Sequence, residues 1–292
     1  MSGLLDGRVA IVTGAGQGLG RAHAEALAAA GAQVVVNDVG DAAKQVADGI
    51  VAAGGKAMPC LADVSDWQDS KRLIDVSLEW FGRLDALVNN AGIVRDRMLV
   101  SMSEEEWDAV LRVNLKGHFC PLHHAAAYWR ERNKAGEEVE ARIVNTSSGA
   151  GLQGSVGQGN YAAAKAGVAA MTLTAAVELG RYGITVNAIA PAARTPMTEE
   201  VFAEQMKAPE QGFDAMDPAN VSPLVVWLAS AESADVSGRV FEAEGGKVGL
   251  ADGWQHGPAV AQEKRWDPAE LGPVVEQVLA EAPAPTPVWG AS

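Results

Sequence analysis

The chain of 292 residues is short of cysteine and of basic side chains, and it has no long apolar run. Its two cysteines, Cys60 and Cys120, lie far apart without CxxC spacing, so the sequence supports neither a disulfide framework nor a structural zinc site. The formal net charge of −14 argues against a surface that recruits phosphate groups, because such surfaces need dense lysine and arginine. We therefore expect reduced thiols, and neither a nucleic acid nor a membrane as a partner.

The beginning of the chain, MSGLLDGRVAIVTG, has no basic stretch followed by an apolar run and a cleavage site. No run of about 18 apolar residues follows it, so no export signal or membrane span is predicted. With 48% hydrophobic and 21% charged residues, the composition is typical of a globular enzyme. These observations together predict a cytoplasmic protein.

Short β-branched runs alternate along the chain with longer stretches rich in alanine and leucine. The order β-α-β-α predicts a doubly wound α/β fold, with a mostly parallel sheet and helices on both faces. No Pro/Gly/Ser linker interrupts the alternation before about residue 250, so we predict one domain over residues 1–253. The expected strands are Val9–Thr13, Val34–Asn37, Leu84–Val88, Arg142–Thr146, Ile184–Ala188 and Arg239–Ala243. The expected helices are Arg21–Ala30, Asp41–Ala53, Asp66–Phe81, Glu104–Arg132 and Tyr161–Gly180.

Residues 254–292 form an extension of different composition. A short helix is expected near Pro268–Ala280, and the proline-rich end APAPTPVWGAS prevents regular structure. The extension is therefore expected to be partly helical or disordered. Two hypotheses stay open for it: a disordered end, or a segment that carries Trp254 and Trp266 over the cleft of a neighbouring subunit.

A glycine-rich turn joins the first expected strand to the first expected helix. Glycines let a pyrophosphate approach the amides that open the helix, where the macrodipole favours anions. Asp38 ends the second strand, 24 positions after Gly14 and close to the spacing of about 20 for a carboxylate that binds the adenosine ribose. This carboxylate repels a 2′-phosphate, so NAD is favoured over NADP; the alternatives are an ordinary tight turn and a capping acid. The turn residues assigned to the cofactor are Gly14, Gly16, Gln17, Gly18, Leu19 and Gly20.

Tyr161 and Lys165 stand four apart on an expected helix, so their side chains share one face. A phenol with a pKa near 10 is a weak base at neutral pH, but a nearby ammonium and an oxidised nicotinamide both favour phenolate. Tyr161 is therefore a candidate to take the proton of an alcohol as hydride leaves. The alternative is a surface pair that contributes only about 0.2–0.5 kcal/mol.

Together these motifs resemble the short-chain dehydrogenase/reductase family over about residues 6–247. The resemblance implies a single Rossmann domain, usually a seven-stranded parallel sheet, and a homodimer or homotetramer packed through long helices. The motifs are TGAGQGLG at Thr13–Gly20, Asp63-Val64, Asn89-Asn90-Ala91-Gly92, Asn114, Ser148 and Tyr161-Ala162-Ala163-Ala164-Lys165.

The resemblance also implies roles for single residues. Lys165 would bind the nicotinamide ribose, Asn114 would hold a water that links Lys165 to solvent, and Ser148 would hydrogen-bond the substrate oxygen. Ser147 remains the alternative to Ser148. Asp63 and Val64 would touch the adenine, and Asn90, Ala91 and Gly92 would line the cofactor cleft. Pro191 and Thr195 would lie beside the nicotinamide carboxamide. The family often has Pro-Gly where this chain has Pro191-Ala192.

The substrate is expected to be an apolar small molecule. Residues 192–217 read as a lid, or alternatively as a surface helix, with Met197, Phe202, Met206, Phe213 and Met216 as its apolar residues. Three stretches resemble the branch containing the dehydrogenase part of peroxisomal multifunctional enzyme type 2: Val34–Gly40, Asn89–Leu99 and Ser222–Ser230.

That branch implies NAD-linked, catabolic oxidation of (3R)-hydroxyacyl-CoA, and some of its members oxidise 17β-hydroxysteroids. Three alternatives stay open: a dehydrogenase of steroids or other secondary alcohols, a 3-oxoacyl-carrier-protein reductase, and a non-catalytic nucleotide-sensing protein. His118, His123 and His124 lie near one another, but no carboxylate or cysteine completes a ligand set, so no metal is expected.

Overall fold

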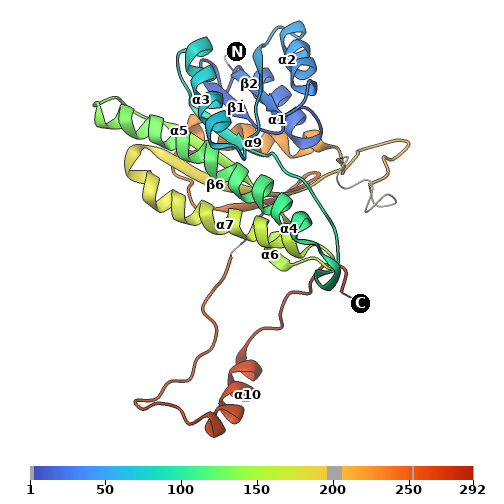
Figure 1. Cartoon of the computed structure of the whole chain (residues 1–292), viewed down its shortest axis with the longest axis vertical. Helices are drawn as coiled ribbons and strands as arrows, with labels where there is room; N and C mark the ends of the chain where they lie inside the picture. The colour runs from blue at the N-terminus through green and yellow to red at the C-terminus, as the bar shows by residue number, and fades with distance from the viewer. Residues whose placement is uncertain (1–2, 196–205, 252, 292) are drawn as a thin grey trace.

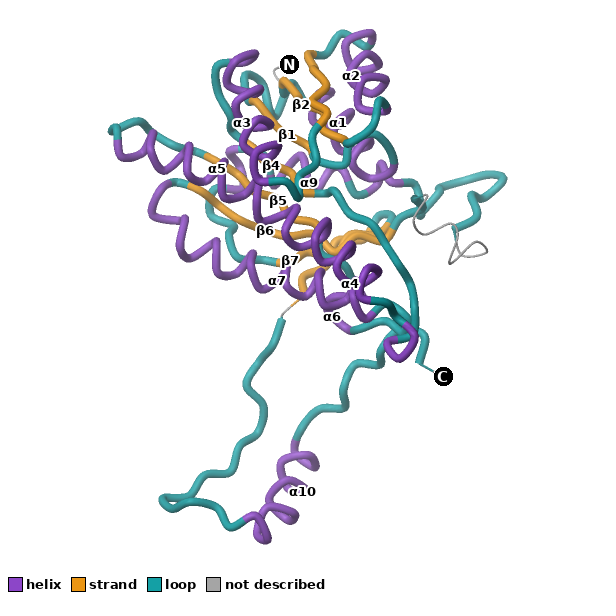
Figure 2. Tube along the Cα trace, viewed as in Figure 1, coloured by secondary structure: helices purple, strands orange, loops and turns teal. Residues whose placement is uncertain are grey.

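The computed structural model describes residues 3–195, 206–251 and 253–291. In this part of the chain one sheet of eight strands runs in the order β3-β2-β1-β4-β5-β6-β7-β8, and only the β7–β8 pair is antiparallel. Figure 2 shows the strands in orange between the helices. The strands are β1 Val9–Val12, β2 Gln33–Asp38, β3 Lys56–Leu61, β4 Ala86–Asn89, β5 Ala141–Thr146, β6 Ile184–Ala192, β7 Val240–Glu244 and β8 Lys247–Ala251.

Helices cover both faces of this sheet, as expected (Figure 1). One buried apolar cluster joins α1, α2 and α9 to the sheet through Leu27, Val46 and Val225. A second cluster joins α3 and α5 to the other face through Leu73 and Trp129. The α-helices are α1 Gly18–Ala29, α2 Ala42–Ala52, α3 Trp67–Phe81, α4 Glu104–Leu111, α5 Gly117–Lys134, α6 Gly149–Gln153, α7 Gly159–Leu179, α9 Ser222–Leu228 and α10 Leu271–Glu281.

The predicted doubly wound Rossmann fold is confirmed, with two additions to its strands. The seven parallel strands include β3, which the sequence pattern did not show because this edge strand has Lys56 and Pro59 in place of a β-branched run. A tight turn at Gly245 then leads into β8, an eighth strand that runs antiparallel along β7. Strand order reverses between β1 and β4, which makes the switch point where α/β proteins bind ligands.

The helix expected over Glu104–Arg132 is a continuous helical run with a change of winding in the middle. It comprises α4, the π-helical turn η2 at Arg112–Lys116, and α5. π-helical turns are rare and occur frequently at functional sites. Here the turn contains Asn114, one of the residues singled out in the sequence.

One long helix bears on the expectation that the chain has no membrane span. The run Gly159–Tyr182, which contains α7, is long and apolar enough to cross a membrane, and 28% of its apolar window is buried. The run is interrupted by Lys165 and by threonines, so it is not the uninterrupted apolar run that the sequence was searched for. Because α7 packs against β6 and α6 and carries Tyr161 and Lys165, we interpret it as a structural helix of the fold.

The C-terminal extension forms a long arm (Figure 1). The arm leaves the body after β8, reaches α10 at its far end, and returns to the body beside α6. The helix expected near Pro268–Ala280 is present as the short turn Pro268–Glu270 followed by α10. No residue of α10 is buried.

Candidate active site

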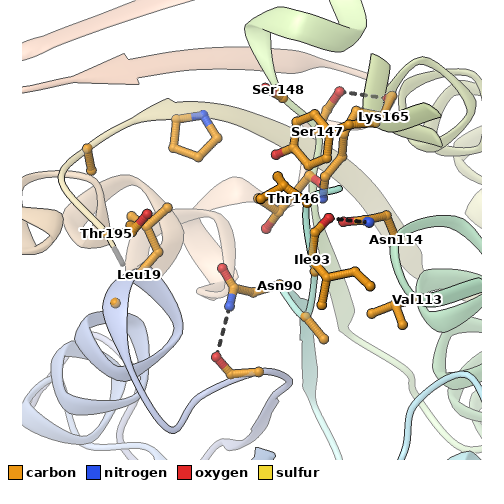
Figure 3. Close-up of a pocket in the computed structure, with 18 of the residues that line it drawn as sticks. Leu19, Asn90, Ile93, Val113, Asn114, Thr146, Ser147, Ser148, Lys165 and Thr195 are labelled. Carbon is orange, nitrogen blue, oxygen red and sulfur yellow. Dashed lines mark hydrogen bonds between the residues drawn. The ribbon is translucent and has the colours of Figure 1, made fainter. Parts of the chain in front are cut away.

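A cavity of about 1000 Å³ opens at the carboxyl ends of the strands, at the switch point between β1 and β4. Its volume lies at the upper end of the roughly 300–1000 Å³ that small-molecule pockets span. In Figure 3, Leu19 and Thr195 lie on one side of the cavity, and Ser148, Lys165 and Asn114 lie on the other. The lining includes these residues singled out in the sequence: Gly14, Gln17, Gly18, Leu19, Asp38, Asp63, Val64, Asn90, Ala91, Gly92, Asn114, Ser148, Tyr161, Lys165, Pro191 and Thr195.

Two of the predicted turn glycines, Gly16 and Gly20, are not among the lining residues. A Cβ at Gly20 would overlap the carbonyl oxygen of Gly14 and lie 2.5 Å from Nδ2 of Asn90. A Cβ at Gly16 would lie 2.8 Å from Oδ2 of Asp38. These two glycines therefore allow the glycine-rich turn and the start of α1 to pack closely against Asn90 and the carboxylate of Asp38, rather than forming the cavity wall.

The remaining turn fits the pyrophosphate of a dinucleotide. Gly14 has φ +60°, and a Cβ there would lie 2.7 Å from Cα of Ala91, so glycine is required by both conformation and space. Gln17 is the N-cap of α1, and its side chain makes no cap hydrogen bond in the described structure. The amides of the first turn are thus open toward the cavity, where the helix dipole favours an anion.

Asp38 lies at the end of β2 with its carboxylate held by three backbone amides. Oδ2 accepts from the amide of Gly16 at 3.0 Å, while Oδ1 accepts from Val39 at 2.8 Å and from Gly40 at 3.4 Å. A carboxylate offers about four lone-pair sites, so one acceptor position remains for a hydroxyl group in the cavity. Asp38 is therefore a residue that could hold a ribose by accepting a hydrogen bond from one of its hydroxyl groups.

Asp63 and Val64 line the same end of the cavity, but the Asp63 carboxylate is already engaged. It accepts hydrogen bonds from Ser65 and forms an ion pair with Arg112 at 2.9 Å. These hydrogen bonds and the guanidinium lower the pKa of Asp63 against the opposing effect of burial. Arg112, which the sequence reading missed, thus joins the π-helical turn to the end of β3.

The two adjacent serines after β5 have different surroundings. Ser147 is buried, and its Oγ donates to the carbonyl oxygen of Lys165 at 2.9 Å. Ser148 is the N-cap of α6, where its Oγ accepts from the amide of Ala150 at 3.2 Å, and it also forms a side-chain hydrogen bond with Tyr161. The hydroxyl of Ser148 is therefore the one beside the candidate proton-transfer group.

Tyr161 and Lys165 lie on one face of α7, with the ammonium 5.7 Å from the centre of the phenol ring. Lys165 is buried and donates to the carbonyl oxygen of Thr146 at 2.7 Å. Burial lowers the pKa of Lys165 to about 7. Burial also raises the pKa of Tyr161, while the hydrogen bond with Ser148 lowers it.

The raised pKa of Tyr161 differs from the sequence expectation that the neighbouring ammonium favours phenolate. The physical reason is that Lys165 shares the desolvated environment, so burial disfavours the charged form of both groups. A positively charged group bound in the cavity would lower the pKa of Tyr161 and favour phenolate, as the sequence expectation assumed.

Asn114 has one satisfied and one unsatisfied end. Its Nδ2 donates to the carbonyl oxygens of Ile93 at 2.8 Å and Val110 at 3.0 Å. Its buried Oδ1 has no partner among the described residues. A Cβ built on Gly92 would lie 2.5 Å from this oxygen and 3.7 Å from Nζ of Lys165, so the space beside Gly92 adjoins both groups. A water molecule that bridges Asn114 and Lys165 would satisfy the buried oxygen.

The expected lid is described in part. Met206 and Met216 line the cavity, whereas Phe213 is exposed, and Met197 and Phe202 lie outside the described residues. Arg194 holds this segment through the carbonyl oxygen of Met206 at 2.9 Å and an ion pair with Asp214.

Several lining residues escaped the sequence reading. Two groups lie next to predicted motifs: Ile93 and Val94 follow the Asn-Asn-Ala-Gly motif, and Val113 precedes Asn114. The motif neighbourhood was a usable signal for these. Trp289 also lines the cavity, and no motif pointed to it.

The three histidines do not form one cluster. His118 is buried, and burial lowers its pKa well below the usual value. His123 and His124 pack at the surface against Trp67, with ring centres 4.7 and 4.4 Å from the indole. Among the described residues no group of three or more histidine, cysteine or carboxylate side chains is arranged to hold a metal.

A family model described as short chain dehydrogenase matches residues 8–206. Hydroxyacyl-CoA dehydrogenase ChsB1 of Mycobacterium tuberculosis is 48% identical over 94% of this chain and 90% of its own. Peroxisomal multifunctional enzyme type 2 of Mus musculus is 41% identical over 84% of this chain, which spans about a third of that enzyme (32%). The 3-oxoacyl-[acyl-carrier-protein] reductase FabG of Thermotoga maritima is also 41% identical, over 84% of this chain and 99% of its own.

A solved structure is similar over almost the whole chain. The crystal structure of a short chain dehydrogenase from Mycobacterium avium is 60% identical, with a TM-score of 0.92 over 99% of this chain and 100% of that one. The likeness therefore includes the C-terminal extension as well as the Rossmann domain.

Proposed function

The chain belongs to the short-chain dehydrogenase family, as an oxidoreductase that acts on hydroxyl or keto groups, and we propose that it oxidises (3R)-hydroxyacyl-CoA to 3-oxoacyl-CoA with NAD. The observation that carries the proposal is that one cavity is lined both by Asp38 and by Ser148, Tyr161 and Lys165. The names of two relatives, the hydroxyacyl-CoA dehydrogenase and the peroxisomal multifunctional enzyme, support the substrate class.

The protein residues have distinct roles in the proposed reaction. The substrate hydroxyl donates to Tyr161 in its phenolate form, which the positive charge of bound NAD would favour, and it accepts from Ser148. The hydrogen bond from Ser148 steadies negative charge on the substrate oxygen as its proton moves to the phenolate oxygen. Lys165 and the water expected beside Asn114 then offer a path for the proton to solvent. NAD, when bound, supplies the ring that accepts the hydride from the substrate carbon that bears the hydroxyl.

The choice of NAD rests on charge at the end of β2. Asp38 and Val39 line the cavity there. Of the cations among the described lining residues, Arg112 pairs with Asp63 and Lys165 lies at the catalytic end. A 2′-phosphate next to Asp38 would thus face a fixed carboxylate without a dedicated partner.

Asp38→Asn tests this choice, because it removes the charge and keeps the size of the side chain. We expect the ratio of kcat/KM with NAD to that with NADP to fall about tenfold or more, since like-charge repulsion of about 1.4 kcal/mol is lost. Asp41→Asn is the matched control, because Asp41 is exposed and pairs with Lys44. An unchanged ratio in Asp38→Asn contradicts the assignment.

The substrate class is tested by initial rates with purified protein on (3R)-hydroxyacyl-CoA with NAD, on 3-oxoacyl carrier protein with NADPH, and on 17β-hydroxysteroids. The proposal expects the first pair to give the highest kcat/KM. Preference for the carrier protein with NADPH would favour the reductase that the Thermotoga relative represents. Activity on steroids alone would indicate a different secondary-alcohol dehydrogenase, and no turnover would favour a nucleotide-sensing protein.

We also propose a homodimer or homotetramer in the cytoplasm. Leu173 and Val177 of α7 are 48% and 85% exposed, and Phe119 of the neighbouring α5 is 43% exposed. Exposed apolar side chains along two long helices are typical of a subunit interface. Both cysteines are buried and unpaired, which suits a reducing compartment.

A further inference from the structure

The C-terminal segment Val288–Gly290 contributes a wall of the catalytic cavity through Trp289. This residue lies beyond the Rossmann domain, at the end of the arm that carries α10 (Figure 1). The arm returns to the body at the loop between α6 and α7, only a few residues before Tyr161. The position of the indole therefore depends on how this segment is attached.

Backbone hydrogen bonds attach the segment to the loop. Trp289 forms a parallel β-bridge with Ser155. The amide of Val156 donates to the carbonyl oxygen of Trp289 at 2.9 Å, and the amide of Trp289 donates to the carbonyl oxygen of Gly154 at 3.3 Å. These contacts fix the backbone of Trp289 next to the catalytic helix.

Close packing then directs the indole toward the reacting groups. A Cβ at Gly149 would lie 2.8 Å from Cη2 of Trp289, so the ring lies directly over this glycine. Gly149 follows Ser148 and begins α6. Trp289 keeps 48% of its surface exposed, and it lines the cavity. An apolar ring face is thus available beside the candidate hydroxyl-binding serine.

The chemistry of an indole indicates which part of a substrate it contacts. Tyr161 and Trp289 are the aromatic residues among the described lining residues. A phosphate or adenine-ribose group would call for cations and polar donors, whereas an indole face offers a large apolar area at low entropic cost. The ring suits the apolar acyl group attached to the carbon that bears the hydroxyl.

We propose that Trp289 is a specificity-determining residue that binds the apolar acyl group of the substrate. The proposal rests on the proposed oxidation of hydroxyacyl-CoA. The C-terminal segment Val288–Gly290 holds the indole beside Ser148, so acyl groups long enough to cover the ring bind more tightly than short ones.

Kinetics on a short and a long substrate test this proposal, with (3R)-3-hydroxybutyryl-CoA and (3R)-3-hydroxydecanoyl-CoA as probes. In Trp289→Ala, kcat/KM for the long substrate should fall about tenfold through a higher KM, while values for the short substrate stay within about twofold. Tenfold corresponds to about 1.4 kcal/mol, the loss of roughly 55 Å² of apolar contact. Trp289→Phe should give an intermediate ratio, because it keeps an aromatic ring.

Trp80→Ala is the control, because Trp80 is 67% exposed on α3 and is not among the described residues that line the cavity. This variant should leave kcat/KM for both substrates unchanged. Equal losses on both substrates in Trp289→Ala, or an unchanged long-to-short ratio, would overturn the specificity role while the proposed oxidation stands. If the wild-type enzyme oxidises neither substrate, the proposed function and this inference fail together.

Discussion

Ser147 and Ser148 are neighbours in sequence with hydroxyl groups in opposite surroundings. The sequence left both as candidates for the substrate contact, because spacing alone does not show which way a side chain points at the end of a strand. In the structure the hydroxyl of Ser147 donates a hydrogen bond to the carbonyl oxygen of Lys165, and the hydroxyl of Ser148 forms a hydrogen bond with Tyr161. The difference arises from the turn into α6, which no local pattern revealed.

Replacement of each serine by alanine should separate the two roles. Ser148→Ala should lower kcat by about 10²–10³, the usual effect of removing one donor that stabilises a developing oxyanion, and should lower stability by about 1 kcal/mol because the N-cap of α6 is lost. Ser147→Ala should lower stability by about 1 kcal/mol, because a buried hydrogen bond is lost, and should retain most activity. Steady-state kinetics and thermal melts measure both. The assignment is wrong if Ser147→Ala is the variant that loses turnover.

Lys165 carries a pH dependence of stability with a definite sign. Its pKa is about 7 in the folded protein and about 10.4 in an unfolded chain, so between these values the unfolded chain binds more protons. The contribution of Lys165 to the free energy of unfolding therefore rises with pH across this window. Below about pH 7 the contribution is constant.

Lys165→Met removes this titration and serves as the reference. From about pH 7 to pH 10, the free energy of unfolding of the wild type should increase relative to Lys165→Met by up to about 1.4 kcal/mol per pH unit. Urea denaturation without cofactor, at one fixed protein concentration, measures the difference. A difference that stays constant over this range contradicts the lowered pKa.

At the scale of elements, the glycine turn, the order of strands and helices, and the helix with Tyr161 and Lys165 all followed from the sequence. Their signals are local: glycines between a strand and a helix, period of hydrophobicity, and four-residue spacing. The edge strand β3 gave no such signal, because it contains Pro59 and has no β-branched run. Proline is tolerated there because one side of an edge strand lacks a partner strand. The π-helical turn and the ion pair of Arg112 with Asp63 depend on tertiary contacts, so they could not be predicted.

The close approach of α1 to Gly14 and Asn90 makes Gly20 a sensitive position in an element that otherwise tolerates alanine. Gly20→Ala would place a Cβ against the carbonyl oxygen of Gly14 and the amide of Asn90. We expect a loss of about 1–3 kcal/mol in the free energy of unfolding from overpacking, together with weaker NAD binding. Denaturant unfolding and cofactor titration measure these two effects.

Gly49→Ala is the matched control for the same substitution inside a helix. Gly49 lies within α2, and a Cβ there would meet nothing within 4 Å. Because alanine favours a helix interior by about 1 kcal/mol over glycine, this variant should be more stable than the wild type. Equal effects at the two positions would show that close packing does not explain Gly20.

At the scale of the whole molecule, the apolar helix α7 and the C-terminal arm both leave large apolar side chains exposed in a single chain. Val177 on α7 is 85% exposed, and Leu279 on α10 is 67% exposed. The sequence indicated an extension that was partly helical, but it did not show that the end of the arm returns to the cavity. That contact joins segments far apart along the chain, between Gly154–Val156 and Val288–Gly290.

Val177→Glu tests the proposed oligomer, because it puts a charge on the exposed face of α7. We expect the wild type to have the mass of a dimer or tetramer in light scattering after size exclusion, and the variant to shift to a smaller species. Val51→Glu is the control, since Val51 is 54% exposed on α2, a different helix. A monomeric wild type, or a variant with the same mass as the wild type, contradicts this interface.

The most direct test of the central claim is the rate of NADH formation from (3R)-hydroxyacyl-CoA by the wild type and by Tyr161→Phe. We predict NAD-linked turnover by the wild type and a kcat lower by about 10²–10⁴ in the variant, with cofactor binding retained, because only the proton acceptor is lost. Equal rates in the two proteins, or a wild type that forms no NADH from any hydroxyacyl-CoA, would contradict the account.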